Sequence, residues 1–187
     1  MRSLENRSSD MSADHSKITC FDLEMCCWED TRQIGEIISF GLCELDLKTG
    51  KITREAHHYV KPVTDTVSEF CTQLTGITQR TVNRQGRPLS EVVNSITAKF
   101  GTKRPYVCWG EDGDYLARMA RRQNFFIPNM VFLNAALLYQ LRKRHVGESI
   151  GLKRAMASED LEFEGNAHNA LNDSRNMARL IAKSNLI

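Results

Sequence analysis

The pattern of apolar residues changes near residue 60, from one typical of strands to one typical of helices. Three extended segments rich in β-branched and apolar side chains precede this point, at 18–24, 34–47 and 51–60. Lys48-Thr49-Gly50 supplies a turn signal between the second and the third. After residue 60 helical spacing dominates, and only two short apolar runs, 106–109 and 130–133, indicate further strands.

Helical spacing is clearest over 89–100, where five apolar residues share one face and Pro88 stands at the start. Further helices are expected at 68–74, 78–82, 137–144, 152–157 and 167–183, with another that contains Tyr115 to Arg122. Three consecutive strands followed by alternating helices and strands predict an α/β fold, with a mixed five-stranded sheet flanked by helices.

Length and composition are those of one globular domain. The chain has 187 residues, of which 41% are hydrophobic and 26% charged, and its net charge of +2 gives no bulk attraction for nucleic acid. Residues 1–16 are polar and are expected to form a flexible tail, which leaves 17–187 as the domain. No apolar segment approaches the roughly 20 residues of a membrane span.

The cysteines favour a reducing compartment. Six are present, none of them in a C-x-x-C pair, and four are isolated within apolar or mixed segments. Cys26-Cys27 and His57-His58 match no zinc spacing. We therefore expect reduced thiols in a cytoplasmic protein rather than a disulfide framework.

Two carboxylates close the first predicted strand. Asp22 and Glu24 lie two residues apart, so both side chains project from the same face of the strand. Carboxylates this close repel each other, and an apolar strand tolerates them best when a hard cation such as Mg²⁺ lies between them. The alternative is a strand that ends in solvent.

Two further groups offer carboxylates. Asp112 and Asp114 lie at the expected start of a helix, where an aspartate either caps the helix or binds a metal. His168 precedes Asp173 by five residues near the start of the last helix. A histidine beside a metal cluster suits a general base, because imidazole titrates near pH 6.5 in water, although a surface histidine is the simpler interpretation.

In this order the acidic segments resemble the motifs of the DEDDh exonucleases, the DnaQ-like branch of the ribonuclease-H-like fold. The first is Phe21-Asp-Leu-Glu24, the second Gly110-Glu-Asp-Gly-Asp-Tyr-Leu116, and the third His168 to Asp173. The segment 68–78, Ser-Glu-Phe-Cys-Thr-Gln-Leu-Thr-Gly-Ile-Thr, is similar to one in the Eri-like subgroup, which includes the three-prime histone-mRNA exonuclease. The third motif departs from the family in having Asn172 where many members have a first aspartate.

The resemblance implies a ribonuclease-H-like fold and a metal-dependent 3′→5′ exonuclease that releases nucleoside 5′-monophosphates from single-stranded 3′ ends, with RNA favoured. Its four implied metal ligands are Asp22, Glu24, Asp112 and Asp173, which would hold two Mg²⁺ or Mn²⁺ ions, and His168 would be the general base. Asp112 is preferred over Asp114 because Tyr115 and Leu116 then fall on the core face. A DNA exonuclease, an oligoribonuclease-like enzyme and a catalytically silent RNA-binding module remain alternatives.

The resemblance also suggests substrate contacts. Met25 would floor the pocket, and Leu74 and Thr75 would form a wedge against the last bases, although Leu74 could equally pack in the core. We expect Trp109 to be a core residue. We expect two basic clusters to be solvated surfaces, with phosphate binding as the alternative for each. They are Arg118 with Arg121 and Arg122, and the run 142–145.

Overall fold

The computed structural model describes residues 16–29, 33, 35–144, 147 and 149–187. Its strands are β1 (Lys17–Met25), β2 (Ile37–Asp46), β3 (Lys51–Tyr59), β4 (Tyr106–Cys108) and β5 (Phe132–Asn134). Its helices are α1 (Glu69–Thr75), α2 (Gln79–Gln85), α3 (Leu89–Phe100), α4 (Asp112–Arg122), α5 (Ala135–Lys143), α6 (Leu152–Ala157) and α7 (Ala170–Ser184). Apart from Ser16, the predicted N-terminal tail lies outside the described residues.

The five strands form one sheet in the order β3-β2-β1-β4-β5. β1 pairs with β2, and β2 with β3, in antiparallel fashion, whereas β4 and β5 extend the sheet in parallel from β1. The predicted mixed sheet is therefore confirmed. β4 pairs with β1 only at Thr19 and Cys20, so the half of β1 that carries Asp22 and Glu24 has an open edge on that side.

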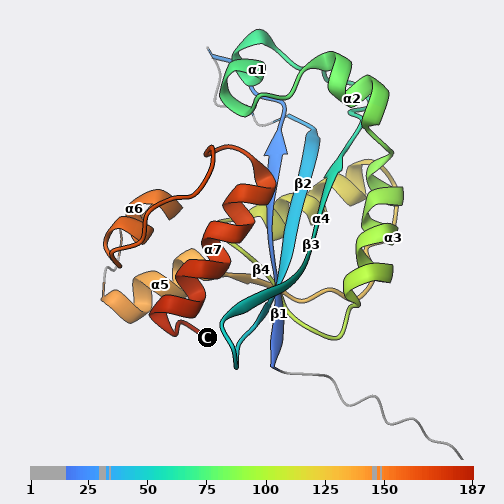
Figure 1. Ribbon diagram of the computed structural model, residues 1–187. Coiled ribbons are helices and arrows are strands. Elements are labelled where there is room, and N and C mark those ends of the chain that lie inside the picture. The colour runs from blue at the N-terminus through green and yellow to red at the C-terminus, as the bar shows by residue number, and fades with distance from the viewer. Residues whose placement is uncertain (1–15, 30–32, 34, 145–146, 148) are drawn as a thin grey trace, which may run out of the picture.

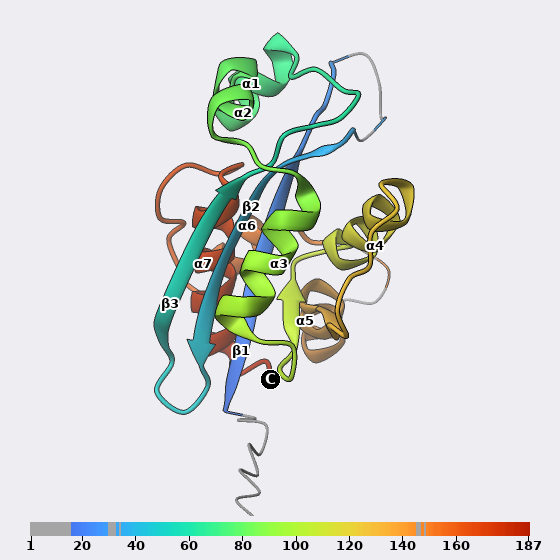
Figure 2. The same cartoon turned by 90° about the vertical axis from the view of Figure 1, so that its right-hand side faces the viewer.

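Helices cover both faces of the sheet (Figures 1 and 2). On one face α3 and α4 pack against apolar side chains such as Phe21 and Phe40. On the other, α5, α6 and α7 pack against residues such as Cys20 and Cys43. Because side chains alternate along a strand, Asp22 and Glu24 share the face of Cys20 and are directed toward α7.

Most helices and strands begin and end within three residues of their predicted bounds. The helices α3 and α6 begin and end at the predicted residues, 89–100 and 152–157. The predicted start of the last helix at residue 167 is wrong, because the side chain of Asn169 caps the helix by accepting a hydrogen bond from the Asn172 backbone N–H. His168 therefore lies in the preceding loop. In the described part of the chain, no helix has both the length and the apolar composition that crossing a membrane requires.

A buried glutamate that the sequence analysis did not single out ties α4 to the start of β2. Glu36 is 2% exposed, and its carboxylate accepts hydrogen bonds from the backbone N–H groups of residues 63, 64 and 65 and from the side chain of Gln123, the C-cap residue of α4. These hydrogen bonds lower the pKa of Glu36, although burial alone would raise it. Tyr115 of α4 also donates to the Gly35 carbonyl. The helix that begins at Asp112 is thus held in place from its far side.

Gly41 lets α7 approach the sheet next to Asp22. It pairs directly with Asp22 across β1 and β2, and a Cβ atom at this position would overlap backbone atoms of Ala170 and Leu171. Only glycine leaves room for the first turn of α7, which carries Asp173. This close contact brings Asp173 to the face that carries Asp22.

We predict that Gly41→Ala destabilises the protein and impairs its activity. Overpacking in a core typically costs about 1–3 kcal/mol, and here the obstacle is backbone, which relaxes less easily than side chains. Thermal unfolding would be compared with that of Gly151→Ala, whose added Cβ has no heavy atom within 4 Å and whose φ is −67°. Equal melting temperatures for the wild type and Gly41→Ala would contradict this role.

Candidate active site

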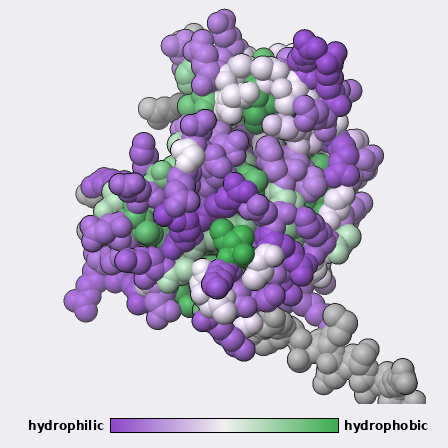
Figure 3. Space-filling model, in the orientation of Figure 1, coloured by the Kyte–Doolittle hydropathy of each residue, from purple (hydrophilic) through white to green (hydrophobic). Residues whose placement is uncertain are grey.

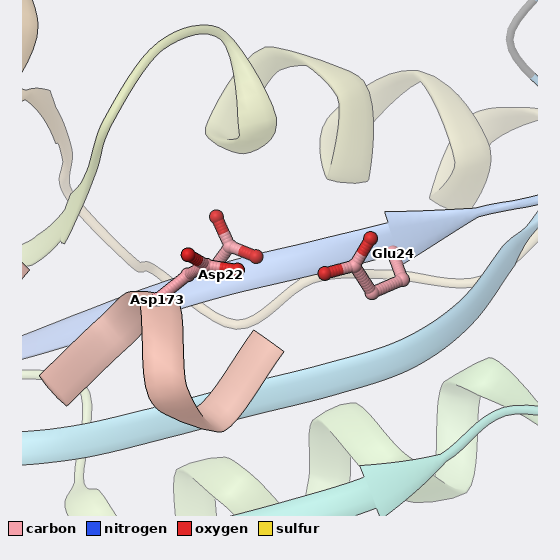
Figure 4. A group of neighbouring side chains, drawn as sticks. All are labelled: Asp22, Glu24 and Asp173. Carbon is pink, nitrogen blue, oxygen red and sulfur yellow. The ribbon is translucent and has the colours of Figure 1, made fainter. Parts of the chain in front are cut away.

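Three carboxylates from two elements converge at the start of α7. Asp22 and Glu24 project from β1 and Asp173 from the first turn of α7, and each offers an oxygen within 4.8 Å of the others (Figure 4). Asp173 has a second task, because its Oδ2 accepts a hydrogen bond from the Asn169 backbone N–H at 3.0 Å. Within the described residues, no ion pair reaches any of the three.

Asp112, the first residue of α4, joins this cluster from the open edge of β1. Its carboxylate accepts a hydrogen bond from the Leu23 backbone N–H, which lies beyond the part of β1 that pairs with β4. Asp112 also raises the pKa of Asp22 and of Glu24, so it lies close enough to repel both. Asp114 is exposed on the same helix. Of the two aspartates that the sequence left open, Asp112 is the one whose charge acts on the cluster, and its assignment as a metal ligand stays a prediction.

Burial disfavours negative charge on all four carboxylates, and repulsion between carboxylates adds to this effect at Asp22, Glu24 and Asp112. Burial is the largest cause in each case, and it raises the pKa of Glu24 to about 8, that of Asp112 to about 7 and that of Asp173 to about 6. The pKa of Asp22 is raised well above its usual range by burial and by the other three carboxylates. A cluster of hard oxygen donors that lacks a protein cation fits one or more divalent ions such as Mg²⁺ or Mn²⁺.

The metal-free protein is expected to lose stability as the pH rises from about 4 to 8. A carboxyl whose pKa is raised by folding stabilises the fold while protonated, and this contribution disappears as pH passes through the folded-state values. Divalent ions should restore it. At roughly 100 times the dissociation constant, Mn²⁺ should raise the melting temperature at pH 8 by about 5–10 °C, and by less at pH 5.5. A shift independent of pH would contradict a carboxylate site.

A cavity of about 560 Å³ opens beside the cluster. Asp22, Glu24, Asp173 and His168 line it, together with Met25 and Trp109. His168 is exposed, and its backbone is left-handed, with φ of 59°. Its charge lowers the pKa of Asp173, so the two side chains lie near each other. This conformation is uncommon for a non-glycine residue and costs on the order of 1 kcal/mol. Such conformations cluster at functional sites, which supports a test of His168.

The predicted substrate contacts divide into two groups. Met25 lines the cavity, whereas Leu74 and Thr75, at the end of α1, are absent from its lining. Leu74 is 39% exposed, so the alternative of core packing is wrong. The Thr75 hydroxyl donates a hydrogen bond to the Cys71 carbonyl, and the Cys71 thiol donates one to the Met25 carbonyl. The second of these contacts places α1 next to the end of β1.

Trp109 packs against the core, as expected, and it also borders the cavity. It packs in the core against Tyr139, its indole N–H donates to the Ile150 carbonyl at 2.9 Å, and its side chain also lines the cavity. Neither predicted basic cluster contributes to that lining. Arg118 lies over the Tyr115 ring and Lys143 pairs with Glu159, while His145 lies outside the described residues.

The second motif provides a direct comparison between neighbouring aspartates. Asp112→Asn is expected to reduce turnover by at least about 10²-fold, because it removes a charge from the cluster that would bind the cations. Asp114→Asn should remain within about threefold of the wild type, since this side chain is exposed to solvent. Steady-state rates in Mg²⁺ distinguish them, and the reverse ranking would move the motif by two residues.

Comparison with known proteins provides independent information about this arrangement. A family model described as RNase_T, exonuclease, matches residues 19–181. The chain is 32% identical to mouse ERI1 exoribonuclease 2 over 87% of its own length, and 29% identical to the Drosophila melanogaster 3′-5′ exonuclease Snipper over 90%. These matches cover 27% and 69% of the two relatives, so the chain spans about a quarter of the length of the first.

A solved structure shows the same fold. The nuclease domain of 3′hExo, described as a DEDDh family member bound to rAMP, superposes with a TM-score of 0.80 at 25% sequence identity. The alignment covers 91% of this chain and 92% of that domain. The predicted ribonuclease-H-like fold and the resemblance to DEDDh exonucleases are thereby confirmed.

Proposed function

This chain belongs to the RNase_T exonuclease family, and on that premise we propose that it is a metal-dependent 3′→5′ exonuclease acting on single-stranded 3′ ends, with RNA as the preferred substrate. The observation that carries the proposal is the cluster of Asp22, Glu24 and Asp173 at the edge of a cavity, with Asp112 beside it. A purely structural cluster of buried carboxylates would be paired with cations from the protein.

In this proposal, Asp22, Glu24, Asp112 and Asp173 hold two Mg²⁺ or Mn²⁺ ions. The bound ions would neutralise charge on the phosphodiester and acidify a water molecule. His168, on the loop before α7, accepts the proton of the attacking water. The left-handed backbone at His168 and the cap at Asn169 hold the loop so that histidine and carboxylates border the same cavity.

The end of the strand requires its own contacts. We propose that Met25 floors the position of the terminal nucleotide, because it lines the cavity directly after the two carboxylates of β1. Leu74 and Thr75 would approach the last bases from α1, where the exposed Leu74 is free to contact a ligand. Stacking on apolar surfaces tolerates any base, as degradation from an end requires.

RNA is favoured for two reasons. The segment 68–78 is similar to that of the Eri-like exonucleases, and several relatives are named exoribonucleases.

The six cysteines are free thiols, which is compatible with the cytoplasm as the proposed location.

A side-by-side digestion tests the substrate class. Equal concentrations of RNA, single-stranded DNA and a duplex with a 3′ overhang would be incubated in Mg²⁺ and in Mn²⁺. We expect the RNA to be degraded at least about tenfold faster than DNA of the same sequence. Faster degradation of DNA would assign the site to a DNA exonuclease, and binding without degradation would indicate a silent RNA-binding module.

A further inference from the structure

The cavity beside the carboxylates has a second wall, which comes from α6 and carries positive charge. Lys153 and Arg154 line the cavity together with residues of β1 and α7. Both side chains are exposed, and within the described residues neither forms an ion pair. The two cations therefore border the same cavity as the carboxylates without pairing with them. The face of the molecule that carries α6 and α7 is mostly hydrophilic, with small apolar patches (Figure 3).

The cavity also continues past α6. A second cavity of about 420 Å³ shares Lys153, Phe163 and Ala167 with the first and adds apolar surface from Leu161. Sites for small ligands typically measure roughly 300–1,000 Å³, so each cavity is large enough for a nucleotide. Lys153 and Phe163 lie where the two cavities meet, which places a cation and an aromatic ring together at the border.

The chemistry of the substrate limits what these groups can bind. In a strand that ends in a 3′ hydroxyl, every phosphate except the one that is cut lies on the 5′ side of the cut. A cationic pair that lies apart from the carboxylates is suited to such a phosphate, and an aromatic side chain supports a base by stacking.

We propose that Lys153 and Arg154 bind the backbone phosphate immediately 5′ of the scissile bond, with Phe163 supporting the base of that nucleotide. This proposal rests on the exonuclease function proposed above and adds a subsite to it. The subsite would hold the shortened strand in place after each cleavage, because it contacts the part of the substrate that remains.

The double variant Lys153→Ala/Arg154→Ala tests the subsite on a single-stranded decaribonucleotide. KM should rise about tenfold while kcat stays within about twofold. The plot of log(kcat/KM) against log salt concentration should become shallower by about 0.7, the contribution of one neutralised phosphate on a single strand. Lys153→Arg/Arg154→Lys keeps both charges and should recover most of the affinity.

The matched control removes two charges at a distance from the site. Lys48 and Lys51 are exposed at the β2–β3 turn, and Lys48→Ala/Lys51→Ala should leave KM and the salt dependence at wild-type values. If the α6 double variant behaved like this control, the pair would be a solvated face and the proposal would be overturned. A fall in kcat at constant KM would overturn it too. A wild-type protein that degrades no strand would instead contradict the proposed function.

Discussion

Asp22→Asn is expected to abolish turnover while making the metal-free protein more stable. Asp22 is the carboxylate that the other three act upon together, and its pKa is raised well above the usual range by burial and by their charges. Removing its charge relieves that repulsion, so the melting temperature of the metal-free protein at pH 8 should rise. The same change removes a ligand from the cation site, and several kcal/mol of transition-state stabilisation correspond to a loss of about 10³-fold or more.

Calorimetry and kinetics on the same preparation test both halves of this expectation. Asp46→Asn is the matched control, because Asp46 lies at the far end of β2, where its side chain caps the hairpin turn through the backbone N–H groups of Lys48 and Thr49. An asparagine there can still accept these bonds, and we expect wild-type turnover. Near-normal activity of Asp22→Asn in Mg²⁺ would remove Asp22 from the proposed site.

The second large effect is expected at His168. We predict that His168→Asn lowers kcat by about 10²–10⁴-fold, the usual contribution of a general base, while Mn²⁺ binding is retained because the carboxylates are intact. Asparagine is chosen because it tolerates the left-handed backbone that His168 adopts. Because a general base accepts the proton of the attacking water, the pH–rate profiles of the wild type and the variant should differ in shape as well as in height.

His58→Gln provides the control for this experiment. His58 pairs with Phe40 across β2 and β3, on the sheet face that α3 and α4 cover, and its ring contacts Arg87. Its replacement should leave the pH–rate profile unchanged. If the profile of His168→Asn had the height and shape of the wild-type profile, His168 would be a solvated loop residue and not the general base. The proposed metal site would be unaffected by that result.

The fold could be predicted from the sequence because its signals are local. Segments rich in β-branched and apolar residues before residue 60, and helical spacing after it, predicted the mixed sheet, and the comparison with a DEDDh nuclease domain confirms it. The start of α7 was placed too early, because the side chain of Asn169 caps the helix, and the apolar pattern carries no signal for that cap. This difference matters for function, since it puts His168 on a loop with its own backbone geometry.

The groups around the site could be predicted only in part. The carboxylates were found because D-x-E, the aspartate three residues before Tyr115 and H-x4-D have fixed spacings, but Gly41, Glu36 and the α6 cations act through distant partners. Gly41 is needed because α7 packs directly against it, and Glu36 accepts hydrogen bonds from a loop some 27 residues away in sequence. A Gly-Leu-Lys-Arg sequence at a helix start indicates exposed cations, yet which cavity they border depends on how α6 packs.

Degradation of a 5′-labelled single-stranded decaribonucleotide tests the central claim most directly. With Mg²⁺ present, the proposed function predicts a ladder of products shortened stepwise from the 3′ end, with nucleoside 5′-monophosphates as the released product. With EDTA in place of Mg²⁺, the strand should remain intact. An undegraded strand in both Mg²⁺ and Mn²⁺, internal cleavage in place of a ladder, or equal degradation in EDTA would contradict a metal-dependent 3′→5′ exonuclease.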